Sequence, residues 1–124
     1  MLPARLAALF GFLGVALGAF GAHALKARLL AAGTHELWHT GVFYQLIHAA
    51  CLLALAFAPA PTPPWLRRSA LAFAAGITVF SGTLYLMALG APRWLGAITP
   101  LGGLCLLAGW SFILVWSLQR RETR

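Results

Sequence analysis

The feature that most constrains this chain is a series of four long apolar stretches without a single Lys, Arg, Asp or Glu. They cover residues 6–25, 37–58, 69–90 and 97–118, and each contains 20 or 22 residues. A helix that crosses a bilayer needs about 20 mostly apolar residues, so each stretch is long enough to span a membrane. Because lipid offers no partner for backbone groups and no period-two alternation is present, helices are expected rather than a barrel. The sequence predicts an all-α, polytopic four-transmembrane-helix bundle, with one domain over residues 1–124.

Composition excludes several other classes of protein. Charged residues make up 9% of the chain, against about 25% in ordinary soluble domains, which argues against a water-soluble globule. The sequence contains no Asp and no Asn, and its two acidic residues are Glu36 and Glu122. Catalytic carboxylate pairs, Asp-dependent triads and acidic metal cages are therefore not expected.

The basic residues predict the orientation in the membrane. If all four stretches span, one side carries six of them: Arg5, Arg67, Arg68, Arg120, Arg121 and Arg124. The other side carries three: Lys26, Arg28 and Arg93. The positive-inside rule then places both termini in the cytoplasm, which makes this a multi-pass protein of the cytoplasmic (inner) membrane. Topology and attraction to anionic lipid account for the basic excess, so the expected partner is the lipid bilayer and not nucleic acid.

The connectors between the stretches are short. Residues 26–36 are expected to lie on the membrane surface as one or two amphipathic turns. Residues 91–96 are expected to form a tight turn. Thr99 and Pro100 then open the last helix, where proline is tolerated in the first turn. Gly102 and Gly103 follow directly, and an ordinary helix start is favoured over a broken helix that exposes backbone groups to a solute.

Glycines predict close helix packing. Gly11, Gly14, Gly18 and Gly21 are spaced by three or four residues and form one face, which includes a GxxxG pair. Such a face lets another helix backbone come close. The later helices add four glycines to this packing set: Gly82, Gly102, Gly103 and Gly109. Packing within one bundle is the main interpretation, and a seam with a second copy or another membrane protein is compatible with it.

A group of polar residues inside the apolar stretches forms a candidate intramembrane site. Its members are His23, Thr40, Tyr44, Gln45, His48, Ser81, Thr83 and Tyr85. Thr40, Tyr44 and His48 recur every four residues and share one helix face. Strongly polar groups within a membrane usually face the protein interior and pair there. Three interpretations stay open: a neutral hydrogen-bond network, a site for a proton, ion or small solute, and a metal or haem site.

One motif matches a metal-binding pattern. His35, Glu36 and His39 read H-E-x-x-H, which on a helix brings two imidazoles and a general base together. The extended motif fails, because Val42 and Gln45 occupy the positions of its glycine and third histidine. The spacing is interpreted as coincidence at a helix start, with Thr34 as the N-cap and Glu36 in the first turn.

His23 is the remaining candidate for a third zinc ligand, and His23 with His39 is the pair to consider for haem. We expect no cofactor and no catalytic residue. Cys51 and Cys105 lie in apolar stretches, where they act as small hydrophobic residues rather than as a disulfide.

Several short motifs resemble the domain of unknown function 423 family of small membrane proteins, which is similar to the transmembrane protein 256 group. They are Gly18-Ala19-Phe20-Gly21-Ala22-His23, Trp38, Thr40-Gly41, Tyr44-Gln45, His48, Phe80-Ser81-Gly82-Thr83-Leu84-Tyr85, Thr99-Pro100-Leu101-Gly102-Gly103 and Ala108-Gly109-Trp110. The motifs occur in all four stretches. The resemblance implies a four-helix membrane fold and a set of marked positions, without a reaction; His35 and Glu36 are not part of the pattern.

The leading hypothesis for function is a non-enzymatic accessory module that packs in membrane complexes or associates with itself. Short loops, missing catalytic acids and small-residue seams favour it. The alternative is a small dimeric transporter or channel lined by the polar site, and a metal- or haem-binding membrane protein is a lesser alternative.

Overall fold

A computed structural model describes the backbone of residues 1–122 and the side chains of residues 1–120. The charges of Arg121, Glu122 and Arg124 therefore lie outside the described side chains. The elements are α1 (Leu2–Ala22), α2 (Lys26–Ala31), α3 (His35–Leu55), α4 (Pro64–Gly76), the π-helix η1 (Ile77–Ser81), α5 (Gly82–Ala88), the 3₁₀-helix η2 (Arg93–Ala97) and α6 (Thr99–Glu122). No strand occurs within residues 1–122, so the prediction of an all-helical chain is confirmed.

Three continuous helical segments of the described chain are long and apolar enough to cross a membrane: Leu2–Ala22, Pro64–Ala88 and Arg93–Arg120. The second consists of α4, η1 and α5, and the third joins η2 to α6. The remaining expected span, residues 37–58, corresponds to α3, which has 21 residues like α1. It is not among the three because its polar residues lower its hydropathy.

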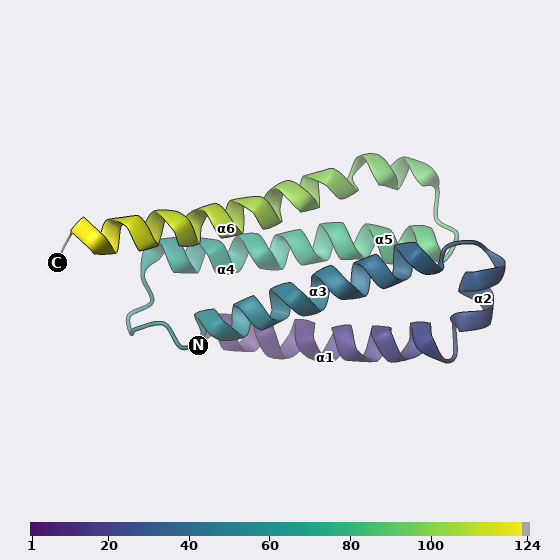
Figure 1. The fold of residues 1–124 in the computed structure, drawn as a ribbon, viewed down its shortest axis with the longest axis horizontal. Helices are drawn as coiled ribbons and strands as arrows, with labels where there is room; N and C mark the ends of the chain where they lie inside the picture. Colours follow the sequence, from purple (N-terminus) through teal and green to yellow (C-terminus); the bar gives the residue numbers. More distant parts are fainter. Residues whose placement is uncertain (123–124) are drawn as a thin grey trace.

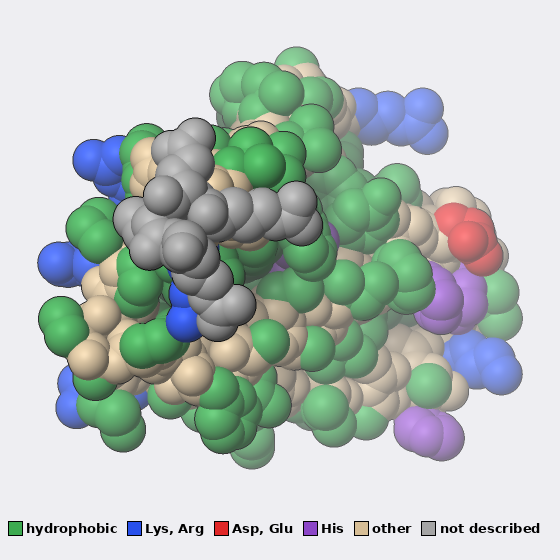
Figure 2. All heavy atoms as spheres, turned by 60° about the vertical axis from the view of Figure 1, so that its left-hand side comes forward, with side chains coloured by type: hydrophobic (Ala, Val, Ile, Leu, Met, Phe, Trp, Pro, Cys, Tyr) green, Lys and Arg blue, Asp and Glu red, His purple; other side chains and the backbone are tan. Residues whose placement is uncertain are grey.

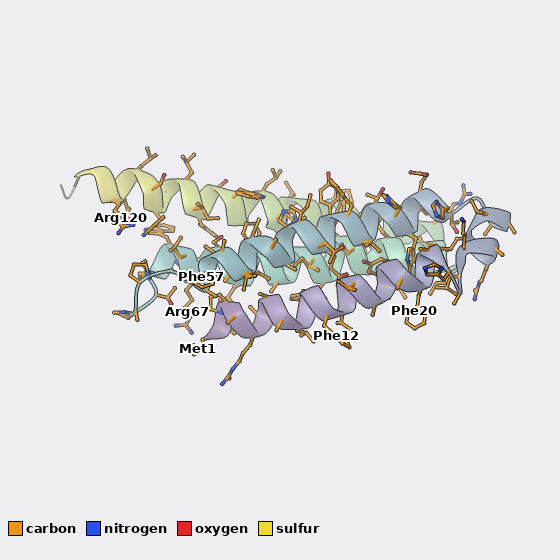
Figure 3. The ribbon with its side chains drawn as sticks, turned by 60° about the horizontal axis from the view of Figure 1, so that its bottom comes forward. Met1, Phe12, Phe20, Phe57, Arg67 and Arg120 are labelled. Atoms are coloured by element: carbon orange, nitrogen blue, oxygen red, sulfur yellow. The ribbon has the colours of Figure 1, made fainter. Side chains whose placement is uncertain are left out.

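The helices lie side by side in the order α1, α3, α4–α5, α6 (Figure 1). α1 packs on α3, and α4 packs on α6, so the molecule consists of two helical hairpins joined where α3 contacts α5, η1 and α4. Two views place α1 and α6 on opposite sides of the molecule (Figures 1 and 3). The described chain begins and ends at the same end of the bundle (Figure 1).

Two buried apolar clusters hold the helices together. One surrounds Phe73 and Leu52, which are completely buried between α3, α4 and α6. The other, at the far end of the bundle, joins Leu29 of α2 to Trp38 and Ala88. The outer surface is also apolar, as Figure 2 shows for one face, which is expected when lipid rather than water surrounds the helices.

Glycines allow the close approach of these helices at specific points. A Cβ on Gly21 would lie 2.4 Å from the Trp38 ring, and one on Gly109 would lie 2.5 Å from Phe73. A Cβ on Gly14 would lie 2.7 Å from Leu46 and one on Gly18 would lie 3.2 Å from Val42, both on α3, and Gly102 lies against the backbone of η1. Three other glycines of the predicted packing set behave differently: Gly11 and Gly82 face open space, and Gly103 makes only an ordinary contact.

The connectors agree in part with the sequence predictions. Residues 26–36 contain the short helix α2, as expected. Residues 91–96 do not form a simple turn, because η2 begins at Arg93 and extends the last span. Thr34 occupies the N-cap position of α3, but its side chain makes no capping bond. The Thr34 hydroxyl instead donates to the carbonyl of Ala88 at 2.8 Å, which fastens this connector to the end of α5.

Candidate functional site: polar groups between the helices

Gln45 connects three helices from a buried position on α3. Its Nε2 donates to the Phe10 carbonyl of α1 at 2.9 Å, and its Oε1 accepts a hydrogen bond from the Tyr85 hydroxyl of α5 at 2.8 Å. The two partners also fix the orientation of the amide, because a carbonyl only accepts and the phenol donates here. The side chain therefore bridges the two hairpins with one donor and one acceptor.

His48 lies one turn further along α3 and bridges to α6. Its Nδ1 lies 2.7 Å from the Tyr44 carbonyl, and the Trp110 indole Nε1 donates to its Nε2 at 3.2 Å. A carbonyl cannot donate and an indole cannot accept, so Nδ1 carries the proton and Nε2 is bare. The arrangement holds a neutral imidazole in one tautomer, with both ring nitrogens engaged.

Four hydroxyl groups make three comparable links. The Ser81 hydroxyl donates to the Gly41 carbonyl at 2.7 Å, where α3 meets η1. The hydroxyls of Thr83 and Thr99 lie 2.7 Å apart and join α5 to the start of α6. The Ser69 hydroxyl donates to the Gly109 carbonyl at 2.8 Å between α4 and α6. Every buried polar side-chain atom of the described residues has a hydrogen-bond partner.

Trp38 adds another polar link between helices, at the end of the bundle near α2. Its indole Nε1 donates to the Leu17 carbonyl at 2.8 Å, and its ring packs against Tyr85 with centroids 4.8 Å apart. The Tyr85 ring also covers Gly41, where a Cβ would lie 2.8 Å from it. The glycine is therefore required for the tyrosine to reach Gln45 across the helix interface.

The remaining predicted residues lie outside the network. His23 and His39 are exposed, and Thr40 is half-buried on α3. The rings of His35 and His39 are 6.3 Å apart, and the Glu36 side chain, 92% exposed, lies 3.9 Å from His35. Within the described part of the chain, no three His, Cys, Asp or Glu side chains are grouped closely enough to hold a metal ion. His23 thus does not join the H-E-x-x-H histidines as a third ligand.

A groove of about 510 Å³ lies near these groups, between α3, η1 and α6. Tyr44, His48 and Trp110 contribute its polar atoms, and Phe80, Leu104 and Leu107 are among its apolar walls. The Tyr44 ring packs on Phe80 with centroids 4.6 Å apart. Of the eight polar residues predicted for the site, only Tyr44 and His48 line this groove.

Sequence reasoning did not include Trp110, Trp38, Thr99 or Ser69 in the site. Trp110 carried a usable signal, because it lies well inside the stretch 97–118. An indole N–H at that depth needs an acceptor, whereas a tryptophan at a helix end is satisfied at the membrane surface. Trp38 and Ser69 bond to backbone carbonyls, which no motif identifies, and Thr99 bonds to the predicted site residue Thr83.

Comparison with known proteins gives a consistent result. Residues 17–103 match the family model described as "Protein of unknown function (DUF423)". The chain is 41% identical over 119 residues to the UPF0382 inner membrane protein YgdD of Escherichia coli (strain K12), with 94% of this chain and 88% of that protein covered. It is 39% identical over 122 residues to the UPF0382 membrane protein YwdK of Bacillus subtilis (strain 168), covering 92% and 94%. A UPF0382 membrane protein of Haemophilus influenzae is 41% identical over 117 residues, covering 94% of each chain. No solved structure matches.

Proposed function

This chain belongs to the DUF423 family of membrane proteins, and from that premise we propose that it is a non-catalytic packing module of the inner membrane. In this proposal it crosses the bilayer four times, keeps both termini in the cytoplasm, and associates through its outer surface with a second copy or with another membrane protein. It needs no cofactor and binds no nucleic acid.

The order of connections supports four crossings. The spans Leu2–Ala22 and Pro64–Ala88 run in the same direction along the bundle, so the chain must return between them (Figure 1). α3 makes this return, and its 21 residues reach about 30 Å at 1.5 Å per residue. That length matches the hydrocarbon core of a bilayer. The buried polar side chains of α3 bond to its neighbours: Gln45 contacts α1 and α5, and His48 contacts α6.

Reporter fusions test this topology. A fluorescent protein at either terminus should fold and fluoresce in the cytoplasm. Alkaline phosphatase inserted in the connectors at Gly33 and at Gly90 should be active, because it needs the periplasm. Phosphatase activity at a terminus, or cytoplasmic fluorescence from a fusion at Gly33, would contradict the proposed orientation.

Hydrogen-bond saturation supports a non-catalytic role. The strongest acid–base candidate in the membrane, His48, spends both ring nitrogens on Tyr44 and Trp110. Gln45, Ser81 and Thr83 are likewise bound to groups of the same chain. A transport pathway draws less support, because these side chains bond to groups within the bundle and do not line one shared cavity. Their hydrogen bonds hold neighbouring helices together.

The observation that carries the association is a groove on the outer surface between α1 and α3. It has a volume of about 330 Å³, and its lining is dominated by small side chains: Ala4, Ala7, Ala8, Gly11, Ala49 and Ala50. Small residues let a further transmembrane helix approach closely, and packing then holds it. A Cβ added at Gly11 would meet no atom within 4 Å, so packing within the bundle does not require a glycine here.

Crosslinking in native membranes tests this surface. In a background with Cys51 and Cys105 replaced by Ala, an Ala8→Cys variant should form a disulfide-linked dimer or a crosslinked complex with another membrane protein. Adding Gly11→Leu should abolish the product by filling the groove. Gly82→Leu is the matched control, because Gly82 also faces open space but lies on α5. Recovery of monomer alone from the Ala8→Cys variant would count against the proposal.

A further inference from the structure

A third groove, separate from those of about 510 and 330 Å³, opens at the end of the bundle that carries both ends of the described chain. It has a volume of about 400 Å³ and lies between the end of α3, the start of α4 and the end of α6. Ala54, Phe57, Leu66, Ile113 and Trp116 supply apolar walls, and Arg120 lies among the lining residues at the outermost position. The groove thus combines an apolar channel with a guanidinium at one end.

The length of this groove corresponds to one leaflet of a bilayer. Along α6 it extends from Arg120 to Trp110, which is about 15 Å at 1.5 Å per residue. That is about half of the roughly 30 Å hydrocarbon core. At its inner end the Trp110–His48 hydrogen bond bridges α6 to α3. An acyl chain from one leaflet would therefore fill the groove and end at this bridge.

The charges at the open end favour an anionic headgroup. The Arg120 guanidinium lies over the Trp116 ring, 5.2 Å from its centroid, and the Arg68 guanidinium lies over Trp65 at 4.6 Å. Trp116 and Arg120 both line the groove, so their contact holds one cation at its mouth, whereas Trp65 and Arg68 are not among its lining residues. Figure 3 shows Arg67 and Arg120 at the same end as Phe57, whose side chain is 85% exposed.

The sequence makes this end strongly positive. Among the described side chains, Arg5, Arg67, Arg68 and Arg120 lie near the ends of α1, α4 and α6 at this end of the bundle (Figure 1). On the other side of Trp110, the groove of about 510 Å³ has no Lys or Arg in its described lining. Two grooves of similar size therefore differ in charge at the mouth.

We propose that the groove between the ends of α3 and α6 binds an anionic phospholipid, with one acyl chain along Ile113 and Trp116 and the phosphate at Arg120. The proposal is independent of the association through α1, because the two grooves use different faces of α3. It is more specific than the general attraction of basic residues to a membrane, since it requires one retained lipid with a defined tail position.

Native mass spectrometry of the full chain tests the proposal. The protein is purified in mild detergent and exchanged into equal amounts of phosphatidylglycerol and phosphatidylcholine with identical acyl chains. We expect one phosphatidylglycerol retained per chain in preference to phosphatidylcholine. Ala54→Phe should remove it by filling the groove, whereas Ala50→Phe, one turn away and lining the other groove, should not. Circular dichroism and size-exclusion profiles establish that both variants are folded.

A charge series tests the headgroup contact. Arg120→Gln should reduce the preference for phosphatidylglycerol about fivefold, the contribution of one basic side chain near an anionic surface. Arg120→Lys should keep most of the preference, and Arg93→Gln at the opposite end should leave it unchanged. Retention of both lipids in equal amounts, or equal effects of Ala54→Phe and Ala50→Phe, would overturn the proposal. So would a dimer that crosslinks through Ala54→Cys in a chain with Cys51 and Cys105 replaced by Ala, because a second copy would then occupy the groove.

Discussion

At the scale of single residues, the side chains that link the helices of this protein bind mainly to backbone carbonyls. Gln45, Ser81 and Trp38 each donate to a backbone carbonyl of another helix. A carbonyl oxygen has two lone pairs, so it accepts this second bond without losing its helical one. Such links fix one helix against another without requiring a second polar side chain inside the membrane.

The bridge from Gln45 to Tyr85 leads to a double-mutant prediction. Tyr85→Phe should lower the free energy of unfolding by about 0.6–2 kcal/mol, the range for one interhelical hydrogen bond in a membrane. Gln45→Leu should cost more, because it also leaves the Tyr85 hydroxyl without its acceptor. In the Gln45→Leu background, Tyr85→Phe should then cost nothing or restore stability. Unfolding by sodium dodecyl sulfate in mixed micelles, followed by circular dichroism, measures all four proteins. Additive losses would show that the two side chains are not coupled.

The sequence identified both members of the Gln45–Tyr85 pair, but not the backbone carbonyls that the other side chains use. Polarity within an apolar stretch is enough to select Gln45, His48 and Tyr85, because such groups are rare in a membrane and must be satisfied. These carbonyls could not be predicted, since every helical carbonyl is a chemically equivalent acceptor. Which one is used depends on the rotation of the helix and on the glycine beside it, as with Gly41 under Tyr85.

At the scale of elements, the span Pro64–Ala88 contains a local change of helix type. Five residues, Ile77–Ser81, form a π-helix within an otherwise α-helical segment. α6 approaches this segment at Gly102, where a Cβ would lie 2.4 Å from the Phe80 backbone nitrogen. The apolar stretches predicted the long helices well, because their length and hydropathy suffice. The π-helix could not be predicted, since no residue pattern in 69–90 distinguishes it from α-helix.

This contact predicts different tolerances at two adjacent glycines. Gly102→Ala should destabilise the protein strongly, because its Cβ would collide with backbone atoms that cannot rotate away, and overpacking typically costs about 1–3 kcal/mol. Gly103→Ala should be tolerated, because the nearest atom to its Cβ is a Phe80 ring carbon at 3.9 Å. Thermal unfolding in detergent compares the two variants with the wild type. Equal melting temperatures for Gly102→Ala and the wild type would mean that α6 can move away from η1.

At the scale of the whole molecule, the two helical hairpins are separable units. α1 packs on α3, and α4 packs on α6, and a connector rich in proline joins them between Leu55 and Pro64. Helices that are individually stable in a bilayer can associate after insertion. We therefore expect the contacts between the hairpins to form without the covalent link.

Co-expression of two fragments tests this independence. Residues 1–60 and residues 61–124 should insert separately and copurify in mild detergent through the contacts of α3 with α5 and η1. Gly41→Leu should abolish copurification, because its side chain would displace Tyr85 from the interface. Gly82→Leu is the matched control, because a Cβ added at Gly82 would meet no atom within 4 Å. Fragments that never copurify would show that the connector is required for assembly.

The placement of α1 at one edge of the molecule and α6 at the other (Figure 1) governs what kind of assembly can form. If the α1 edge of one copy met the α6 edge of the next, both outer edges would stay available and copies would add in an open row. If two α1 edges met about a two-fold axis, the assembly would close after a single step. The choice between an unlimited array and a discrete pair is therefore made by which edges are complementary.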